Sequence, residues 1–289
     1  IHGPVYGTLS GELLDNDLVE AGRARERDLM HQFGVYERVR NADALGKRVR
    51  SKWLDDYKVG EDGQRFVRSR LVAMEIAWDA RSDTFAGTPP LKAVRLGLAL
   101  ACMMGASMLV CLYDVSVAFY HAALDENIHI VPPPGEEEPG WAWQLKRALY
   151  GTRRASHLFQ GFIMEVLSAA GFQRITLACQ VFWHATKKIY ALVHGDDFMI
   201  IATSACADWM DEVLSAKLMI KRGPRIGNPL HGGVSSGSFL KRVIQWTPSG
   251  FMWHHDPKHV TTIVKACLGS KAPPRRSISP ASKTVAKKY

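Results

Sequence analysis

Two adjacent carboxylates, Asp196 and Asp197, follow Gly195 in the middle of an apolar stretch. The flanking residues, 189–193 and 198–202, are mostly apolar and rich in residues that favour strands. Gly beside Asp is typical of a tight turn, so the pattern predicts a β-hairpin with the two carboxylates at its tip. Like charges this close repel when they are buried, and a bound divalent cation removes that cost. Metal binding and an Asp-rich surface turn both remain open.

A third carboxylate, Asp114, ends the apolar run 109–113, which reads as a buried strand. An Asp at the end of such a strand usually caps the helix that follows it. It is also a carboxylate that could meet the hairpin pair, and the sequence leaves both interpretations open.

Basic and apolar residues alternate over residues 65–72, after a Gly-rich turn. In a strand this alternation puts Arg68 and Arg70 on one face, and Val67 and Leu71 on the other. A hairpin with a basic face is suited to phosphate groups, although any solvated hairpin has the same pattern.

The composition indicates a globular protein with an anionic partner. The 289 residues include 47% hydrophobic and 22% charged residues, and the formal net charge is +9. This charge favours nucleic acid or an anionic membrane surface. Five scattered cysteines without a C-x-x-C pair are typical of reduced thiols in an intracellular protein. The chain starts at Ile1 without a signal-peptide pattern, so we expect a piece of a longer protein.

The order of predicted elements favours an α+β fold with helices packed on a mixed or antiparallel sheet. The uncharged run 96–113 has the length of a membrane span, but a Gly-Ala-Ser break divides it. We expect a buried helix and a buried strand there, and no membrane partner. Helices are expected over 21–30, 91–104, 156–170, 206–217 and 260–268, after an irregular lead (1–23) and before a basic disordered tail (269–289).

Several motifs, in order, resemble the reverse transcriptase domain of copia-type LTR retrotransposon polyproteins. The resemblance covers about residues 24–245 and rests on weak motifs at matching spacing. These are Arg68-Ser69-Arg70-Leu71-Val72-Ala73, Thr84-Phe85-Ala86, Asp114-Val115-Ser116-Val117-Ala118-Phe119, Leu149-Tyr150-Gly151, His194-Gly195-Asp196-Asp197 and Phe239-Leu240.

The resemblance implies a right-hand polymerase fold, with fingers and palm over 24–245 and the start of a thumb over 246–268. It implies RNA-directed DNA polymerase activity by a two-metal mechanism, with Mg²⁺ as cofactor and Mn²⁺ as a possible substitute. Asp114, Val115 and Asp196 would hold the metal, and Asp197 would support catalysis.

The same resemblance assigns the incoming nucleotide to four residues. Arg68 and Arg70 would grip the triphosphate or the template, and Arg154 stands where the family has a Gln that contacts the nucleotide. Phe119 would exclude a ribose 2′-hydroxyl, unless it is simply a core residue. The implied partners are a primed RNA or DNA template, dNTPs, and integrase and RNase H domains outside this chain. The implied location is a cytoplasmic particle or the nucleus.

Departures from the family pattern keep a second hypothesis open. His194-Gly195 replaces Tyr-Val, and Ser156, His157 and Phe159 replace Pro, Arg and Trp. A decayed copy that acts at most as a basic nucleic-acid-binding module would show such changes. Two weaker features are also noted. His254, His255 and His259 have a spacing compatible with a metal site, and Trp141 and Trp143 could stack on bases.

Overall fold

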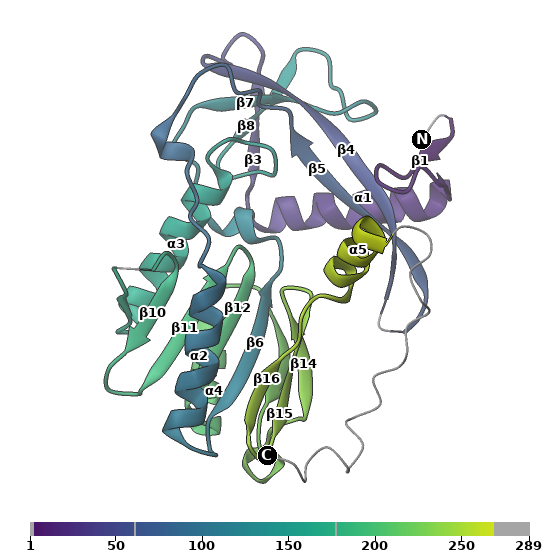
Figure 1. Cartoon of the computed structure of the whole chain (residues 1–289). Coiled ribbons are helices and arrows are strands. Elements are labelled where there is room, and N and C mark those ends of the chain that lie inside the picture. Colours follow the sequence, from purple (N-terminus) through teal and green to yellow (C-terminus); the bar gives the residue numbers. More distant parts are fainter. Residues whose placement is uncertain (1–2, 61, 177, 269–289) are drawn as a thin grey trace.

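The two largest β-sheets of the protein are joined end to end, with helices packed on both (Figure 1). The computed structural model describes residues 3–60, 62–176 and 178–268. We call the two sheets the upper sheet and the central sheet, after their places in Figure 1.

The central sheet has six strands, all paired antiparallel. In spatial order they are β13 (Ile220–Ile226), β6 (Leu109–Val115), β12 (Asp197–Ala202), β11 (Ile189–His194), β10 (Val181–His184) and β9 (Gln173–Arg174). The middle strands β6, β12 and β11 are apolar along nearly their whole length and buried. Such strands are stable only when both faces of the sheet are covered.

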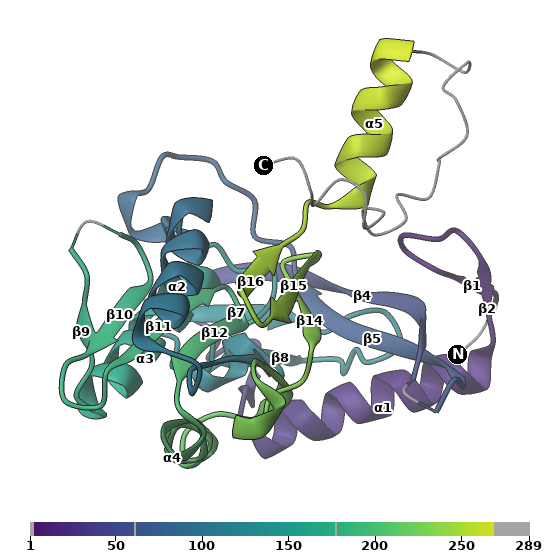
Figure 2. The same ribbon diagram turned by 60° about the horizontal axis from the view of Figure 1, so that its bottom comes forward.

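Two layers cover the central sheet. Alternate residues of β6 and β12 face helices α3 (Ala155–Ala169) and α4 (Ser204–Ser215), which pack behind the sheet in Figure 1. The intervening residues face α2 (Leu91–Met104) and a small sheet on the other side, as Figure 2 also shows. That small sheet contains β14 (Ser236–Phe239), β15 (Arg242–Thr247) and β16 (Gly250–Trp253), and α5 (Pro257–Leu268) follows it.

The upper sheet contains strands from the first half of the chain. Its order is β3 (Tyr36–Arg40), β8 (Trp141–Leu145), β7 (Ile128–Val131), β4 (Lys47–Val59) and β5 (Arg65–Ala73). Only β4 and β7 pair in parallel among these described strands. Helix α1 (Asn16–Gln32) packs on β5, and β1 (Val5–Tyr6) pairs with β2 (Leu13–Leu14) beside it. Short helical turns are η1 (Ser82–Thr84), η2 (Ala118–His121) and η3 (Pro229–His231).

The α+β class and the antiparallel sheet backed by helices are confirmed. Helix α2 has the predicted bounds, and α3, α4, α5 and the 109–115 strand lie within a few residues of prediction. Residues 1–23 are not irregular throughout, because α1 begins at Asn16. The Asp15 side chain accepts hydrogen bonds from the amides of Asp17 and Leu18 at this helix end. The tail 269–289 lies outside the described residues.

The uncharged run 96–113 is divided between α2 and β6, as expected. Within the described residues, none of the helices has the length and apolar character needed to cross a membrane.

Two contacts join the end of β5 in the upper sheet to residues 150–151, which lie shortly before α3. The Ala73 amide at the end of β5 donates to the carbonyl of Tyr150, over 2.7 Å. Gly151 follows with a φ of +83°, and a Cβ there would lie 1.9 Å from the Ala73 carbonyl oxygen. Glycine is therefore required twice at this position, by its backbone conformation and by the close approach of β5.

A buried acid links α1 to η2. The Glu26 side chain is buried, with 6% of the residue exposed, and it accepts a hydrogen bond from the Tyr120 hydroxyl over 2.5 Å. Burial raises the pKa of Glu26 above its ordinary value, and the nearby guanidinium groups of Arg68 and Arg70 act in the opposite direction.

Substitution of Gly151 tests the junction between β5 and α3. Gly151→Ala is expected to lower the free energy of unfolding, measured in urea, by at least about 1 kcal/mol more than Gly135→Ala. The control has a similar φ of +90° with open space around its Cβ position, so it reports backbone strain alone, about 1–2 kcal/mol. Equal losses in the two variants would show that the close approach is absent.

The raised pKa of Glu26 predicts a pH dependence of stability. The folded state keeps this proton to higher pH than the unfolded chain, so its stabilisation is complete below the ordinary value of 4.5 and is lost as pH rises through the folded pKa. Glu26→Gln stays neutral and can still accept from Tyr120, so its stability should fall less between about pH 5 and pH 8 in urea titrations. The exposed Glu165→Gln variant is the control, and parallel profiles for all three proteins would exclude this role.

Candidate active site

A cleft of about 450 Å³ lies at the junction of the two sheets. One wall comes from α1 and β5, and the other from the end of β6 and the β11–β12 turn. Five of the residues proposed from the sequence line it together, namely Arg68, Arg70, Asp114, Val115 and Asp196.

The hairpin predicted around the adjacent carboxylates is present. His194 of β11 pairs with Asp197 of β12, which leaves Gly195 and Asp196 as a two-residue turn. Gly195 has a φ of +64°, the left-handed conformation that a type II′ turn requires at its first central position. The turn places Asp196 at the lip of the cleft, where its backbone carbonyl accepts from the Val115 amide over 2.9 Å.

The strand register brings charged groups of three strands into one row. Asp114 of β6 lies directly between Asp197 of β12 and Lys221 of β13. Directly paired residues of antiparallel strands point to the same face, so the three side chains lie on the side of the sheet that also packs against α2. Sequence reasoning did not identify Lys221, because only the pairing of β13 with β6 brings it to the site.

The electrostatics of this row follow from burial and mutual repulsion. Burial and the Asp196 carboxylate raise the pKa of Asp114, while Lys221, Arg68 and Arg70 act to lower it. Burial raises the pKa of Asp197 to about 6, with further contributions from Asp196 and Asp114. Adjacent cationic charge therefore only partly compensates the carboxylates.

The donor set fits a hard divalent cation. Carboxylate oxygens of Asp114 and Asp196 and the carbonyl of Val115 are the ligand types that Mg²⁺ accepts. None of the hydrogen bonds or ion pairs found among the described residues uses the side chains of Asp114, Asp196 or Asp197, so their oxygens are available. The described residues do not contain a converging group of three or more His, Cys, Asp or Glu side chains that would form a complete protein cage. Substrate and water oxygens would therefore have to complete the coordination, as is usual for Mg²⁺.

The two arginines of β5 form the basic wall of the cleft. As predicted, Arg68 and Arg70 share one face of the strand, while Val67 and Leu71 are buried on the other. The guanidinium carbon of Arg70 lies 4.8 Å from the centroid of the Tyr150 ring, which fixes its direction. Burial and the charge of Arg70 lower the pKa of Arg68. Arg68 is therefore a cation that an anionic ligand would stabilise.

A strained residue separates Asp114 from Phe119. Val117 has φ 46° and ψ 44°, a left-handed conformation that is rare for β-branched residues and costs on the order of 1–3 kcal/mol. It lines the cleft and is the N-cap residue of η2. Phe119 itself packs between the rings of Tyr150 and Phe159, at centroid distances of 4.8 and 6.3 Å, and does not line the cleft.

Arg154 is held outside the cleft. It forms ion pairs with Asp125 and with Asp83, the latter at 3.3 Å. Asp83 is shared with Arg81, at 2.6 Å. The structure therefore does not bring Arg154 together with the other proposed nucleotide-binding residues.

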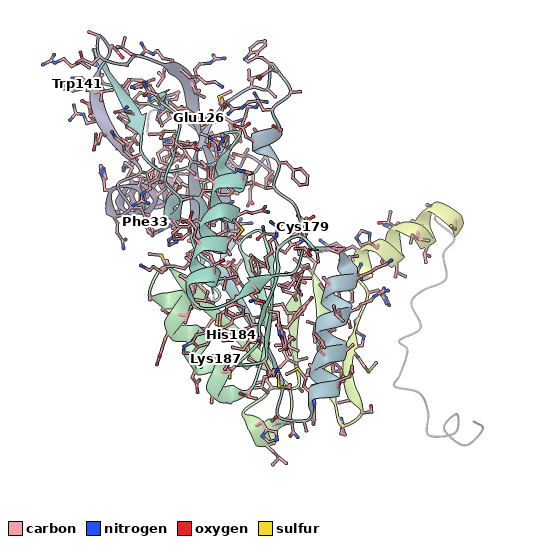
Figure 3. The ribbon with its side chains drawn as sticks, turned by 90° about the vertical axis from the view of Figure 1, so that its left-hand side faces the viewer. Phe33, Glu126, Trp141, Cys179, His184 and Lys187 are labelled. Carbon is pink, nitrogen blue, oxygen red and sulfur yellow. The ribbon has the colours of Figure 1, made fainter. Side chains whose placement is uncertain are left out.

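The two weaker sequence features have structural partners of their own. His259 lies 3.8 Å from Asp256, and these residues do not belong to a metal-binding cluster within the described part. The guanidinium carbons of Arg38 and Arg40 lie 4.8 and 5.0 Å from the Trp141 ring, at the far end of the upper sheet (Figure 3). Trp143 is buried and stacks on Tyr36.

Residues 33–222 match the family model described as "Reverse transcriptase (RNA-dependent DNA polymerase)". This match contains the whole upper sheet and all of the central sheet except the second half of β13, and it includes every residue that the sequence proposed for the active site.

Relatives of this chain are transposon proteins. It is 32% identical over 96 residues to a transposon Ty5-1 protein of Saccharomyces cerevisiae, covering 32% of this chain and 31% of that protein. It is 26% identical over 163 residues to the retrovirus-related Pol polyprotein from transposon RE1 of Arabidopsis thaliana, covering 53% and 11%. The chain thus spans less than a third of the length of either relative.

Among solved structures, apo telomerase from Candida tropicalis superposes with a TM-score of 0.49 at 7% identity, over 86% of this chain and 63% of that one. A similarity of this size does not contribute to the assignment, which rests on the family model and the transposon relatives. The chain belongs to the reverse transcriptase (RNA-dependent DNA polymerase) family, within its copia-type branch, and its α+β architecture is the right-hand polymerase fold of that family.

Proposed function

We propose that this domain extends a primer on an RNA or DNA template by transferring nucleotides from dNTPs. The observation that carries the proposal is the convergence in one cleft of Asp114 and Asp196 with the cationic groups of Arg68, Arg70 and Lys221. Carboxylates that can hold a metal, facing cations that can hold phosphates, are what nucleotidyl transfer requires.

In this proposal Asp114, Asp196 and the Val115 carbonyl hold Mg²⁺. The metal, when bound, supplies positive charge that stabilises the attacking and leaving oxygens of the transfer. Asp197 is half-buried and its pKa is raised to about 6, so it is about half ionised near pH 6; we give it a supporting role beside the two ligands.

The basic wall would receive the triphosphate. Arg68 and Arg70 point from β5 into the cleft and face Asp114 across it. Their charges would neutralise the phosphates while the primer 3′-hydroxyl attacks the α-phosphate and pyrophosphate leaves.

Sugar discrimination would depend on Phe119. The ring is held from two sides by Tyr150 and Phe159, and the strained turn at Val117 fixes the start of η2. A ring fixed in this way would resist displacement by a 2′-hydroxyl if it lies under the incoming sugar.

We propose the fingers and palm for residues 24–245, and the start of the thumb for 246–268. The net charge of +9 supports a nucleic-acid partner held mainly by its phosphates.

A non-enzymatic module that only binds nucleic acid is the second candidate. Arg154 favours it, because its ion pairs with Asp125 and Asp83 keep its charge away from the cleft. Primer extension on poly(rA)–oligo(dT) with dTTP and Mg²⁺ separates the two, since a module of this kind would bind the duplex and leave the primer unextended.

Removing one proposed ligand should abolish extension. Asp114→Asn and Asp196→Asn are each expected to lower the extension rate by more than about a hundredfold, since even outer-shell changes at metal sites cost about 10–100-fold. The same variants should bind Mg²⁺ more weakly in calorimetry without substrate. Asp43→Asn, an exposed carboxylate in the turn after β3, should behave as wild type. Extension that survives either cleft substitution contradicts the assignment.

Shortening Phe119 should relax sugar selection. Phe119→Ala is expected to raise rNTP incorporation relative to dNTP incorporation about tenfold or more, measured as the ratio of kcat/KM values. Phe162→Ala removes a partly buried ring packed on the same core cluster and is the control for general loosening. An unchanged ratio would leave Phe119 as a core residue.

A further inference from the structure

A buried acid, Glu26, lines the same cleft as Arg68 and Arg70, and the proposed reaction does not use it. It belongs to α1, which lies beside β5 (Figure 1), and only 6% of the residue is exposed. Its carboxyl group accepts a hydrogen bond from the Tyr120 hydroxyl over 2.5 Å. A carboxyl group this buried is costly to ionise unless a cation pairs with it.

Two guanidinium groups lie near Glu26 without pairing with it. Burial raises the pKa of Glu26, although four neighbouring groups favour its ionised form. These groups are the Tyr120 hydroxyl, the Leu71 amide and the guanidinium groups of Arg68 and Arg70. In the described part of the chain, neither arginine forms an ion pair with a carboxylate. Both positive charges are therefore available to an anionic ligand while Glu26 is protonated.

The other titratable groups of the cleft have different partners or face it from the central sheet. Arg25, on the same helix, donates to the Val67 carbonyl over 2.9 Å. The ring centroid of Tyr150 lies 5.9 Å from that of Tyr120. The opposite wall contributes Asp114, Asp196 and Lys221. Among the residues that line the cleft, Glu26 is thus the carboxyl group on the basic wall.

We infer that Glu26 tunes the charge of the basic wall and takes up a proton from solvent when the triphosphate binds. A protonated Glu26 leaves the full charge of Arg68 and Arg70 to the phosphates, whereas an ionised Glu26 offsets part of it. The bound phosphates in turn disfavour a negative carboxylate beside them. Glu26 is a positioning residue, since it acts on the phosphates through the two arginines. The inference rests on the proposed function, which assigns the triphosphate to this wall.

The test measures binding of inorganic tripolyphosphate by calorimetry, without metal. Wild type and Glu26→Gln should bind equally near about pH 5, where position 26 is neutral in both proteins. As pH rises through the folded pKa of Glu26, the wild type should lose affinity that the variant keeps. We expect the variant to bind about tenfold more tightly near about pH 8, which corresponds to one pKa unit between the free and bound protein. The affinity ratio is compared because the phosphates themselves titrate alike with both proteins.

Two other variants separate the charge of Glu26 from its contribution to the fold. Glu165→Gln, at an exposed position of α3, should follow the wild type at every pH. Tyr120→Phe keeps the carboxyl group and removes one group that favours its ionised form, so the loss of affinity should move to higher pH. This variant carries the comparison if Glu26→Gln melts early. A profile that is unchanged, or moved to lower pH, would overturn the inference.

Proton uptake provides a second readout. Calorimetry in two buffers of different ionisation enthalpy should show that the wild type takes up more protons on binding than Glu26→Gln does. Equal uptake, or a constant affinity ratio between about pH 5 and about pH 8, would overturn the inference and leave the proposed function intact. If Arg68→Gln/Arg70→Gln binds tripolyphosphate as tightly as the wild type, the triphosphate site of the proposed function fails together with the inference.

Discussion

Electrostatic repulsion among Asp114, Asp196 and Asp197 is the constraint around which the rest of the molecule is built. Burial and the neighbouring carboxylates raise the pKa values of Asp114 and Asp197, so the site is costly in the absence of cations. The apolar strands β6, β11 and β12 hold them in place, because slipping the register by one residue would turn every core side chain to the wrong face. Hydrophobic burial thus stabilises an arrangement that the charges themselves oppose.

The cationic side chains that partly offset this repulsion come from different parts of the fold. Lys221 belongs to the central sheet itself, whereas Arg68 and Arg70 belong to the upper sheet. The charge balance of the cleft therefore depends on how the two sheets meet. Close contacts such as that between Gly151 and Ala73, and the buried pair of Glu26 with Tyr120, hold that junction. Residues remote from the carboxylates in sequence thereby set their electrostatic environment.

Local patterns in the sequence predicted the parts of the site that local chemistry determines. The Gly195 turn, the alternation of Arg68 and Arg70, and the strand ending at Asp114 follow from turn propensity and strand periodicity. The position of Lys221 beside Asp114, and the diversion of Arg154 to Asp125 and Asp83, depend on long-range pairing. Motif spacing does not contain that information, so the sequence could not provide it.

The register of β6 also has a kinetic consequence. Its two neighbours, β12 and β13, lie far later in the chain, beyond the strands β7 and β8 of the upper sheet and the whole of α3. During synthesis β6 can therefore pair with β12 and β13 only after the intervening segments have been made and have begun to fold. Such non-local antiparallel pairing slows folding, since the loop entropy is lost before the contacts form. The three carboxylates are thus brought together among the last features of the domain, and a truncated nascent chain that ends before the β11–β12 turn would carry only Asp114.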